Sequence, residues 1–166
     1  MNSEDLLQHY AQGVRRFAKA DLPKVNLNLQ DLSHIDLSYA NLSKATLHGA
    51  LLLCAKLNHI NLENAKMIGV ELSGANLSHA NLFNALLSSS ELTGASLQDA
   101  NLQGVTLNYS VLRGTNLRNA NLSRANLKGV DLSGADLWGA NLHQADLSGA
   151  ILDNTLMPNG KFADLD

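Results

Sequence analysis

A leucine recurs at every fifth residue of this chain, and that period excludes most folds. Between residues 22 and 152, 26 of the 27 positions in this register are Leu, and Met67 is the exception. On an α-helix five residues turn through about 500°, so successive leucines would drift around the helix and form no apolar stripe. On a straight β-strand they would alternate between two faces. The period therefore predicts a chain that turns once per unit, so that every leucine faces one core.

A second apolar register lies two residues before the leucines. Between residues 20 and 155, 17 of its 28 positions are Ala and another six are Val or Ile. In an extended segment these two residues share a side, and the polar residue between them points away. Ten of the 12 Gly occupy the second position after the leucine register, where they favour a turn. Each unit is therefore predicted to be a short extended side followed by a corner, as in a solenoid.

The number of sides per coil follows from which surface residues stack. At a separation of fifteen residues the residue before the leucine changes without pattern, as in Asn41, Lys56, Glu71 and Leu86. At a separation of twenty the series that contains Asn41 reads Asp21, Asn41, Asn61, Asn81, Asn101, Asn121 and Asn141. Four sides per coil are therefore favoured. This gives about seven coils, which rise by roughly 4.8 Å each if they stack like strands.

The units ANLSH (75–79), ANLSR (120–124), ADLWG (135–139) and ADLSG (145–149) match the consensus A(D/N)LXX. In these repeats the chain resembles the pentapeptide repeat family, in the form found in cyanobacteria, over about 140 of its 166 residues. The resemblance implies an all-β solenoid, specifically a right-handed quadrilateral β-helix. It implies little about activity, because a shared fold is not a shared chemistry. Known members include DNA mimics that bind DNA gyrase, and many others have no assigned activity.

The first nineteen residues lie mostly outside the repeat and are predicted to form a helical cap. Ser3 is expected to cap a helix over about residues 4–14. Its apolar face would carry Leu6, Leu7, Tyr10 and Val14. An end coil exposes core leucines and unpaired backbone, so a docked helix would cover both.

The repeat is expected to span residues 20–157, and the chain then leaves it through Pro158 and Gly160. Residues 158–166 are predicted to form a C-terminal cap or tail, in which FADL at 162–165 loosely echoes the repeat. This segment is short for a cap. We therefore expect either a monomer or an end-to-end homodimer.

Charge and composition exclude several classes of function. The net charge is −3 and the isoelectric point is near 6.0, so direct nucleic acid binding is not expected. Cys54 is the single cysteine, which excludes an intramolecular disulfide framework. The polar N-terminus does not resemble a signal peptide, and no apolar run approaches the roughly 20 residues of a membrane span. The expected location is the cytoplasm, with no membrane association.

Two clusters of side chains could carry chemistry. In a four-sided coil Tyr39, His59, His79 and Asp99 share one corner, where the two imidazoles and the carboxylate could hold a metal weakly. The alternative is a row of solvated turn residues. His34 and Cys54 form a similar pair, but a Cys–His nucleophile needs a pocket, which a convex rod does not offer.

The remaining candidate is an exposed apolar side chain. Leu51, Leu86, Val111 and Ile151 stand where a polar residue is usual, and Phe83 and Trp138 follow their leucines. Trp138 is the best single anchor for a protein partner. The sequence therefore predicts a non-enzymatic scaffold for protein–protein interaction, without a cofactor and with its partner unknown. The alternative is a DNA mimic that inhibits or protects DNA gyrase, and a weak metal-binding protein comes third.

Overall fold

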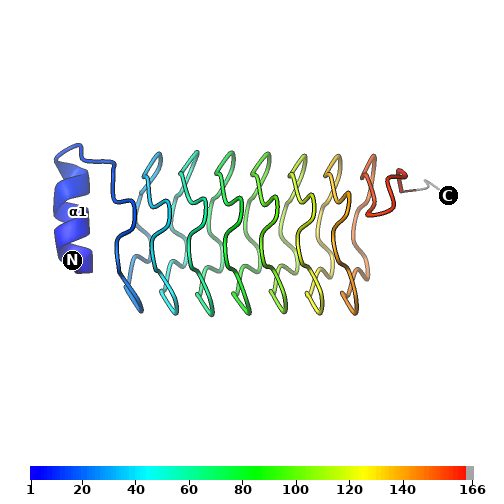
Figure 1. The fold of residues 1–166 in the computed structure, drawn as a ribbon, viewed down its shortest axis with the longest axis horizontal. Helices are drawn as coiled ribbons and strands as arrows, with labels where there is room; N and C mark the ends of the chain where they lie inside the picture. Colours follow the sequence, from blue (N-terminus) through cyan, green and yellow to red (C-terminus); the bar gives the residue numbers. More distant parts are fainter. Residues whose placement is uncertain (164–166) are drawn as a thin grey trace.

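The structure, a computed structural model, describes residues 1–163 as a rod built from one continuously coiling chain (Figure 1). Within these residues the one helix is α1, Ser3–Ala11. Beyond it, neighbouring coils pair through isolated parallel bridges, and no strand in the described range is longer than its bridge residue. The predicted β-solenoid is confirmed. No helix in residues 1–163 is long and apolar enough to cross a membrane.

Each coil contains four five-residue units. Every parallel bridge joins residues twenty apart, from Arg16 with Asp36 to Asp136 with Leu156. In a typical unit the N–H of Leu42 donates to the carbonyl of Asn61 on the next coil at 2.8 Å, and the N–H of Ala45 donates back to Leu42 at 3.1 Å. The first bond stacks the coils and the second closes the turn.

The corners need a left-handed backbone whether or not glycine is present. Gly74 has φ +65°, as its position after Leu72 predicts, but Lys44 and His59 adopt nearly the same angle, with φ 59° and 58°. A side chain in this region costs energy that glycine avoids. Because corners without glycine persist throughout the rod, we infer that the stacked coils on either side hold their conformation.

The core consists of the two predicted apolar registers. The leucines from Leu22 to Leu137 are buried, as is Met67, and the alanines between them are similarly enclosed. The hydroxyl residues that replace alanine are also buried, and each donates to a carbonyl of the preceding coil: Ser90 to Met67, Ser110 to Leu87, Thr115 to Leu92 and Thr155 to Leu132. A buried hydroxyl without a partner would be costly, so these bonds explain how the core accommodates them.

Helix α1 is shorter than predicted, and a different residue caps it. The N-cap is Asn2, whereas the prediction that Ser3 would cap the helix was wrong. The Asn2 side chain accepts from the N–H of Asp5 at 2.9 Å, and the Asp5 carboxylate accepts from the N–H of Asn2 at 3.1 Å. This reciprocal pair satisfies two N–H groups, which Ser3 could not do from inside the helix. The helix ends at Ala11, just before Gly13 with φ +91°.

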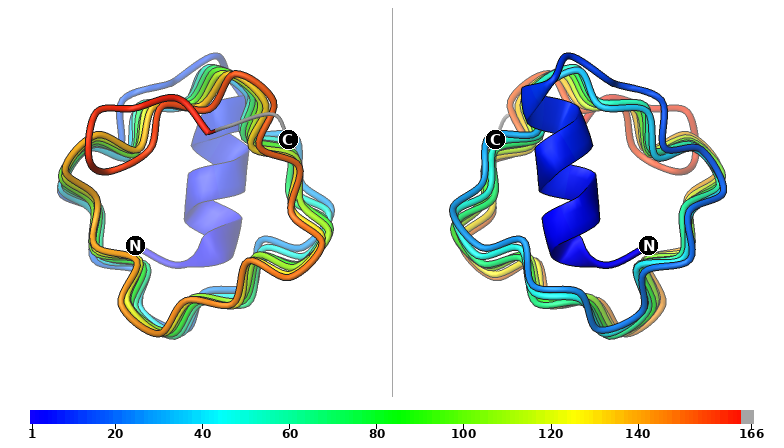
Figure 2. Two further views of the ribbon diagram at one scale, coloured as in Figure 1. Left: turned by 90° about the vertical axis from the view of Figure 1, so that its right-hand side faces the viewer. Right: turned by 90° about the vertical axis from the view of Figure 1, so that its left-hand side faces the viewer.

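The helix lies across the open end of the first coil (Figure 2, right). Leu6 is fully buried there, and Leu7 and Tyr10 pack against the same core. The Tyr10 hydroxyl donates to the carbonyl of Ser33 at 2.8 Å, which ties the helix to the backbone of the coil. Val14 is 39% exposed, so its predicted place on the buried face was wrong, because the helix has already ended.

At the other end the chain folds back on itself. Leu156 and Phe162 form an antiparallel bridge, and the N–H of Met157 donates to Lys161 at 2.7 Å. This short hairpin crosses only one part of the terminal coil (Figure 2, left). Leu142, Leu147 and Leu152 of that coil are accordingly only half-buried. Positions 164 and 165 of the predicted FADL echo lie outside the described residues.

Candidate functional site

The sides of the rod present polar residues that the backbone holds in place. Where the residue before a buried leucine is Asn, Asp or Glu, its side chain usually accepts a hydrogen bond from the N–H two residues later, as in Asn61 with Glu63 at 3.1 Å and Asn121 with Ser123 at 3.1 Å. Asparagine and aspartate are suited to this local turn. The outer surface is therefore regular, and many of its polar side chains have fixed positions before any partner binds.

The asparagine series found in the sequence forms a ladder along one side. From Asn41 to Asn101 the side-chain amide donates to the residue one coil before it: Asn41 to Asp21 at 2.8 Å, Asn61 to Asn41 at 3.3 Å, Asn81 to Asn61 at 3.2 Å and Asn101 to Asn81 at 3.1 Å. The side-chain amides satisfy one another. This column is therefore better suited to holding coils together than to binding a ligand.

Two of the four basic residues in the second half of the repeat are paired with an aspartate one coil further on. Arg113 donates to Asp131 at 2.5 Å, and Arg118 lies 3.5 Å from Asp136. Burial acts to raise the pKa of the Asp131 carboxyl, but hydrogen bonds from Ser133 and Arg113 outweigh it and hold that pKa below its usual range. These two pairs neutralise part of the positive charge on this section of the rod.

Trp138 lies on the same column as Arg118, one coil later. Its side chain is 46% exposed, and the Arg118 guanidinium lies over its ring at 5.1 Å from the centroid. Asp136 contacts the same arginine, so Trp138, Arg118 and Asp136 form one cluster, which we call the Trp138 cluster. The sequence suggested Trp138 alone. Counting back twenty residues from it would also have found Arg118.

The other apolar residues singled out in the sequence are spread over the surface. Leu51, Leu86 and Ile151 are exposed, whereas Val111 and Phe83 are half-buried. Sequence reasoning missed Leu29 and Tyr109, which are 80% and 59% exposed. Both occupy the left-handed corner position, where the side chain points outward, so the corner register was the signal that could have found them.

The predicted corner column of Tyr39, His59, His79 and Asp99 is present. The Tyr39 and His59 rings stack with centroids 4.6 Å apart, and the His59 and His79 rings stack at 4.7 Å. The Nε2 atom of His79 lies 3.9 Å from the Asp99 carboxylate. A metal binds in the plane of each imidazole, and these planes are nearly parallel at 8°, so their lone pairs do not converge. No group of three potential ligands in residues 1–163 is arranged to hold a metal ion.

His34 and Cys54 both occupy left-handed corner positions one coil apart, with φ 62° and 52°. Cys54 is exposed, and Gly74, whose backbone lies close to its sulfur, continues the column. The two recesses described below lie at the ends of the rod, away from this pair. The arrangement therefore lacks the enclosing pocket that a nucleophilic cysteine requires.

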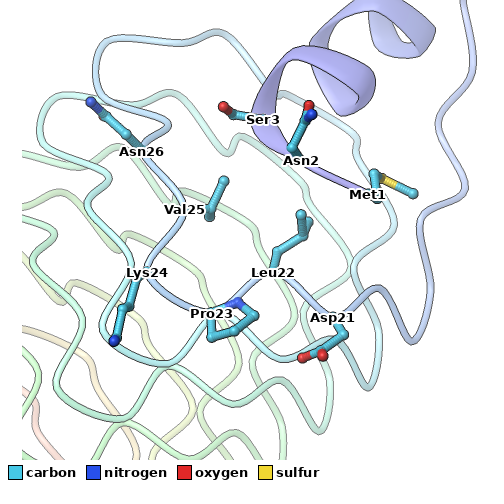
Figure 3. A pocket seen from close by; sticks show the side chains of 9 residues that line it. All are labelled: Met1, Asn2, Ser3, Asp21, Leu22, Pro23, Lys24, Val25 and Asn26. Atoms are coloured by element: carbon cyan, nitrogen blue, oxygen red, sulfur yellow. The ribbon is translucent and has the colours of Figure 1, made fainter.

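The recess at the N-terminal end has a volume of about 290 Å³ and lies where α1 meets the first coil (Figure 3). One wall is formed by residues 1–3 and the other by residues 21–26. A second recess of about 320 Å³ lies beneath the C-terminal hairpin, at residues 157–163. Both recesses are open, and neither gathers a set of catalytic side chains. They are consistent with gaps left where non-repeat segments meet the ends of a solenoid.

Comparisons with known proteins agree with this architecture. The model of the family Pentapeptide repeats matches in eight copies, over residues 16–52, 31–67, 54–82, 80–119, 95–134 and 120–159. No curated protein matches the chain significantly. A trypsin-treated variant of QnrB1, a plasmid-mediated fluoroquinolone resistance protein, has a similar structure, with 20% identity, 84% of this chain and 89% of that chain covered, and a TM-score of 0.60.

Two cyanobacterial proteins also match. HetL of Nostoc sp. strain PCC 7120, a pentapeptide repeat protein involved in heterocyst differentiation regulation, is 26% identical over 98% of this chain and 100% of its own, with a TM-score of 0.46. Rfr23 of Cyanothece 51142 is 24% identical over 93% of this chain and 98% of its own, with a TM-score of 0.42.

Proposed function

The chain belongs to the pentapeptide repeat family, and from this we propose that it is a non-enzymatic scaffold that binds a protein partner through the sides of the rod. The main support is the fixed polar surface, in which side chains such as Asn61 and Asn121 are held by hydrogen bonds to their own backbone. Binding to such a surface orders few side chains, so little entropy is lost.

We propose the Trp138 cluster as the anchor for that partner. Aromatic and arginine side chains contribute disproportionately to binding at protein interfaces, and here Arg118 lies over the half-exposed Trp138 ring. Asp136 lies 3.5 Å from the Arg118 guanidinium and helps to hold it in place before a partner binds. A partner could cover the ring without having to order the arginine.

The experiment compares Trp138→Ala with Tyr109→Ala, a matched control that removes another exposed aromatic residue from a corner. The tagged original chain would be used to capture partners from a lysate of the source cells, and each captured protein would be purified and titrated against the original chain and both variants. Its Kd should rise at least about 30-fold for Trp138→Ala and little for Tyr109→Ala. If both variants bind the purified partner as tightly as the original chain, the anchor lies elsewhere.

The finer architectural predictions belong to the same proposal. These are the right-handed quadrilateral form with about seven coils, a cap at 1–19, the repeat at 20–157 and a tail at 158–166. A cytoplasmic location, monomeric or end-to-end dimeric assembly, and the absence of direct nucleic acid or membrane binding complete it. A crystal structure would test the handedness, and localisation of a tagged chain would test the compartment.

The gyrase alternative is less well supported by the charges of the rod. A DNA mimic needs a dense acidic surface, whereas residues 20–157 carry 11 acidic and eight basic side chains, several of which are paired. We therefore expect no change in the supercoiling activity of purified gyrase at a large molar excess of this protein. Inhibition or protection under those conditions would favour the mimic over the scaffold.

Metal binding is the third candidate, and it would depend on rotation of the His59 and His79 rings out of their stack. We expect weak zinc binding at most, because the ground-state geometry is not that of a site. Calorimetric zinc titration of the original chain and of a His59→Ala, His79→Ala double variant tests this. Equal heats would exclude the pair.

A further inference from the structure

The backbone of this solenoid is polar along its axis. In a typical unit the N–H groups of Leu22 and Lys24 donate to the following coil, whereas the N–H of Asn41 donates to the preceding one, each at 2.8 Å. Each unit therefore directs two N–H groups and one carbonyl towards the C-terminal end, and one N–H and two carbonyls the other way. Peptide dipoles that point unequally in two directions leave a net dipole. The two ends of the rod are therefore chemically different.

The C-terminal edge, defined here as the backbone of residues 140–154, is rich in donors. By the repeating bond pattern, the carbonyls of Ala140, Ala145 and Ala150 point towards the C-terminal end of the rod. They accept no backbone hydrogen bond within residues 1–163. Six N–H groups on this edge have no hydrogen-bond acceptor within the same residues: Leu142, Gln144, Leu147, Gly149, Leu152 and Asn154. The half-buried side chains of Leu142, Leu147 and Leu152 belong to the same edge.

The N-terminal edge, defined as the backbone of residues 16–33, is rich in acceptors. By the same pattern it presents N–H groups at Arg16, Asp21, Asn26 and Asp31, and carbonyls at Arg16, Ala18, Asp21, Pro23, Asn26, Asn28, Asp31 and Ser33. The contact that α1 makes with this edge is of matching polarity, because the Tyr10 hydroxyl donates to Ser33. The helix thus covers the edge that would complement the C-terminal one.

The two edges also match in register. If a second copy is rotated by a quarter turn, its residues 16–19 follow directly after residues 156–159 of the first copy. The repeating bond pattern then continues across the junction without a gap. In this arrangement the six free N–H groups meet, in order, the carbonyls of Arg16, Ala18, Asp21, Pro23, Asn26 and Asn28 of the second copy.

The side-chain charges favour the same orientation. Residues 15–34 carry Arg15, Arg16, Lys19 and Lys24 against only Asp21 and Asp31. Residues 140–159 carry Asp146 and Asp153 and no lysine or arginine. A head-to-tail contact would bring opposite charges together, whereas a symmetric contact between two C-terminal edges would oppose acid to acid and donor to donor.

We propose that the C-terminal edge is a docking surface for the first coil of a second copy of this chain, arranged head to tail, and that α1 blocks this contact. The contact is heterologous, so it would extend into linear chains of rods if α1 left the first coil. The C-terminal hairpin would have to move aside, and it is held by few contacts, since Phe162 is 64% exposed. The inference concerns the ends of the rod and does not depend on the proposed binding by its sides.

The test uses full-length variants that each leave one edge available. Leu6→Asp places a charge in the buried contact of α1 and should free the N-terminal edge. Leu147→Lys places a charge in the exposed cross-section of the last coil and should block the C-terminal edge. The double variant therefore offers only its N-terminal edge, whereas the original chain offers only its C-terminal edge. Leu147→Lys alone offers neither and is the matched control.

Sedimentation over a range of concentrations should show the original chain, the double variant and the Leu147→Lys control each as a monomer when alone. Mixing the double variant with the original chain should give a one-to-one complex, mixing the control with the original chain should give none, and Leu6→Asp alone should form linear oligomers that lengthen with concentration. If Leu6→Asp loses the far-UV CD spectrum of the solenoid, the milder Leu6→Ala takes its place. The proposal is wrong if the folded double variant does not bind the original chain. It is also wrong if the original chain forms a dimer with itself and this dimer does not bind the double variant.

Discussion

The two ends of the rod differ although they are built from the same repeat. Leu22, in the first coil, is only 3% exposed, because α1 lies across it with Leu6 fully buried. Leu147, in the last coil, occupies the same position of its unit but is only half-buried, because the C-terminal hairpin covers one part of the cross-section (Figure 2). A repeat therefore specifies the middle of a solenoid and leaves its ends to other sequence.

This comparison also indicates where the stability lies. Each coil packs only on its two neighbours, so a leucine is buried as deeply as the layers on either side allow. Leu97 has a coil on each side and is completely buried, whereas Leu147 has one coil below it and little above. Substitutions of the same chemistry at the two positions should therefore have very different effects.

The largest effect is expected for Leu97→Asp. The carboxylate would enter a core without a partner, and we expect a loss of about 4 kcal/mol or more in the free energy of unfolding. Leu147→Asp should cost much less, because its carboxylate can reach water at the open end. Urea unfolding followed by far-UV CD measures both. Equal losses would mean that the open end is as enclosed as the centre.

A second experiment compares the two segments that lie outside the repeat. Leu6→Ala removes a fully buried side chain from the contact between α1 and the first coil, which should cost about 2–5 kcal/mol if that contact unfolds together with the rod. Phe162→Ala removes a side chain that is 64% exposed and should change the melting temperature little. If Leu6→Ala is also neutral, α1 opens independently of the solenoid and is free for another role.

The sequence predicted the regular parts of the molecule for a physical reason. In a solenoid every coil has the same surroundings, so the leucine and alanine registers and the spacing of twenty residues fix the core, the sides and the corners, as they do at Leu42 and Ala45. The stack of Tyr39, His59 and His79 followed from the same spacing. Its orientation did not, because the angle between rings depends on side-chain rotamers that spacing does not determine.

The non-repeating parts were predicted less well. Both Asn2 and Ser3 are good N-cap residues, and only the reciprocal bonds between Asn2 and Asp5 decide which one caps α1. The early end of the helix at Ala11 placed Val14 outside the buried face. For the candidate site, Trp138 was visible as a lone aromatic residue, but its pairing with Arg118 required the geometry of the coil.

A smaller effect than that of Leu6→Ala is expected for Tyr10→Phe, which keeps the packing of α1 and removes only the hydrogen bond to Ser33. The loss should be about 0.5–1.5 kcal/mol near neutral pH, because the Ser33 carbonyl keeps access to water only in part. Tyr109→Phe is the matched control, since that hydroxyl is on an exposed corner.

The pKa of Tyr10 is raised above its ordinary value, chiefly by burial, which outweighs the opposing charge of Arg15, with a smaller raising effect from Asp31. A raised pKa means that the folded state favours the neutral phenol. The stability that Tyr10 contributes is thus complete below the pKa of an unfolded tyrosine, near 10, and is lost as the pH rises through the higher pKa of the folded state. Melting temperatures of the original chain and of Tyr10→Phe should therefore converge in alkaline solution, whereas Tyr109→Phe should follow the original chain throughout. A constant difference between the original chain and Tyr10→Phe up to pH 11 would show that the hydroxyl does not hold the helix to the first coil.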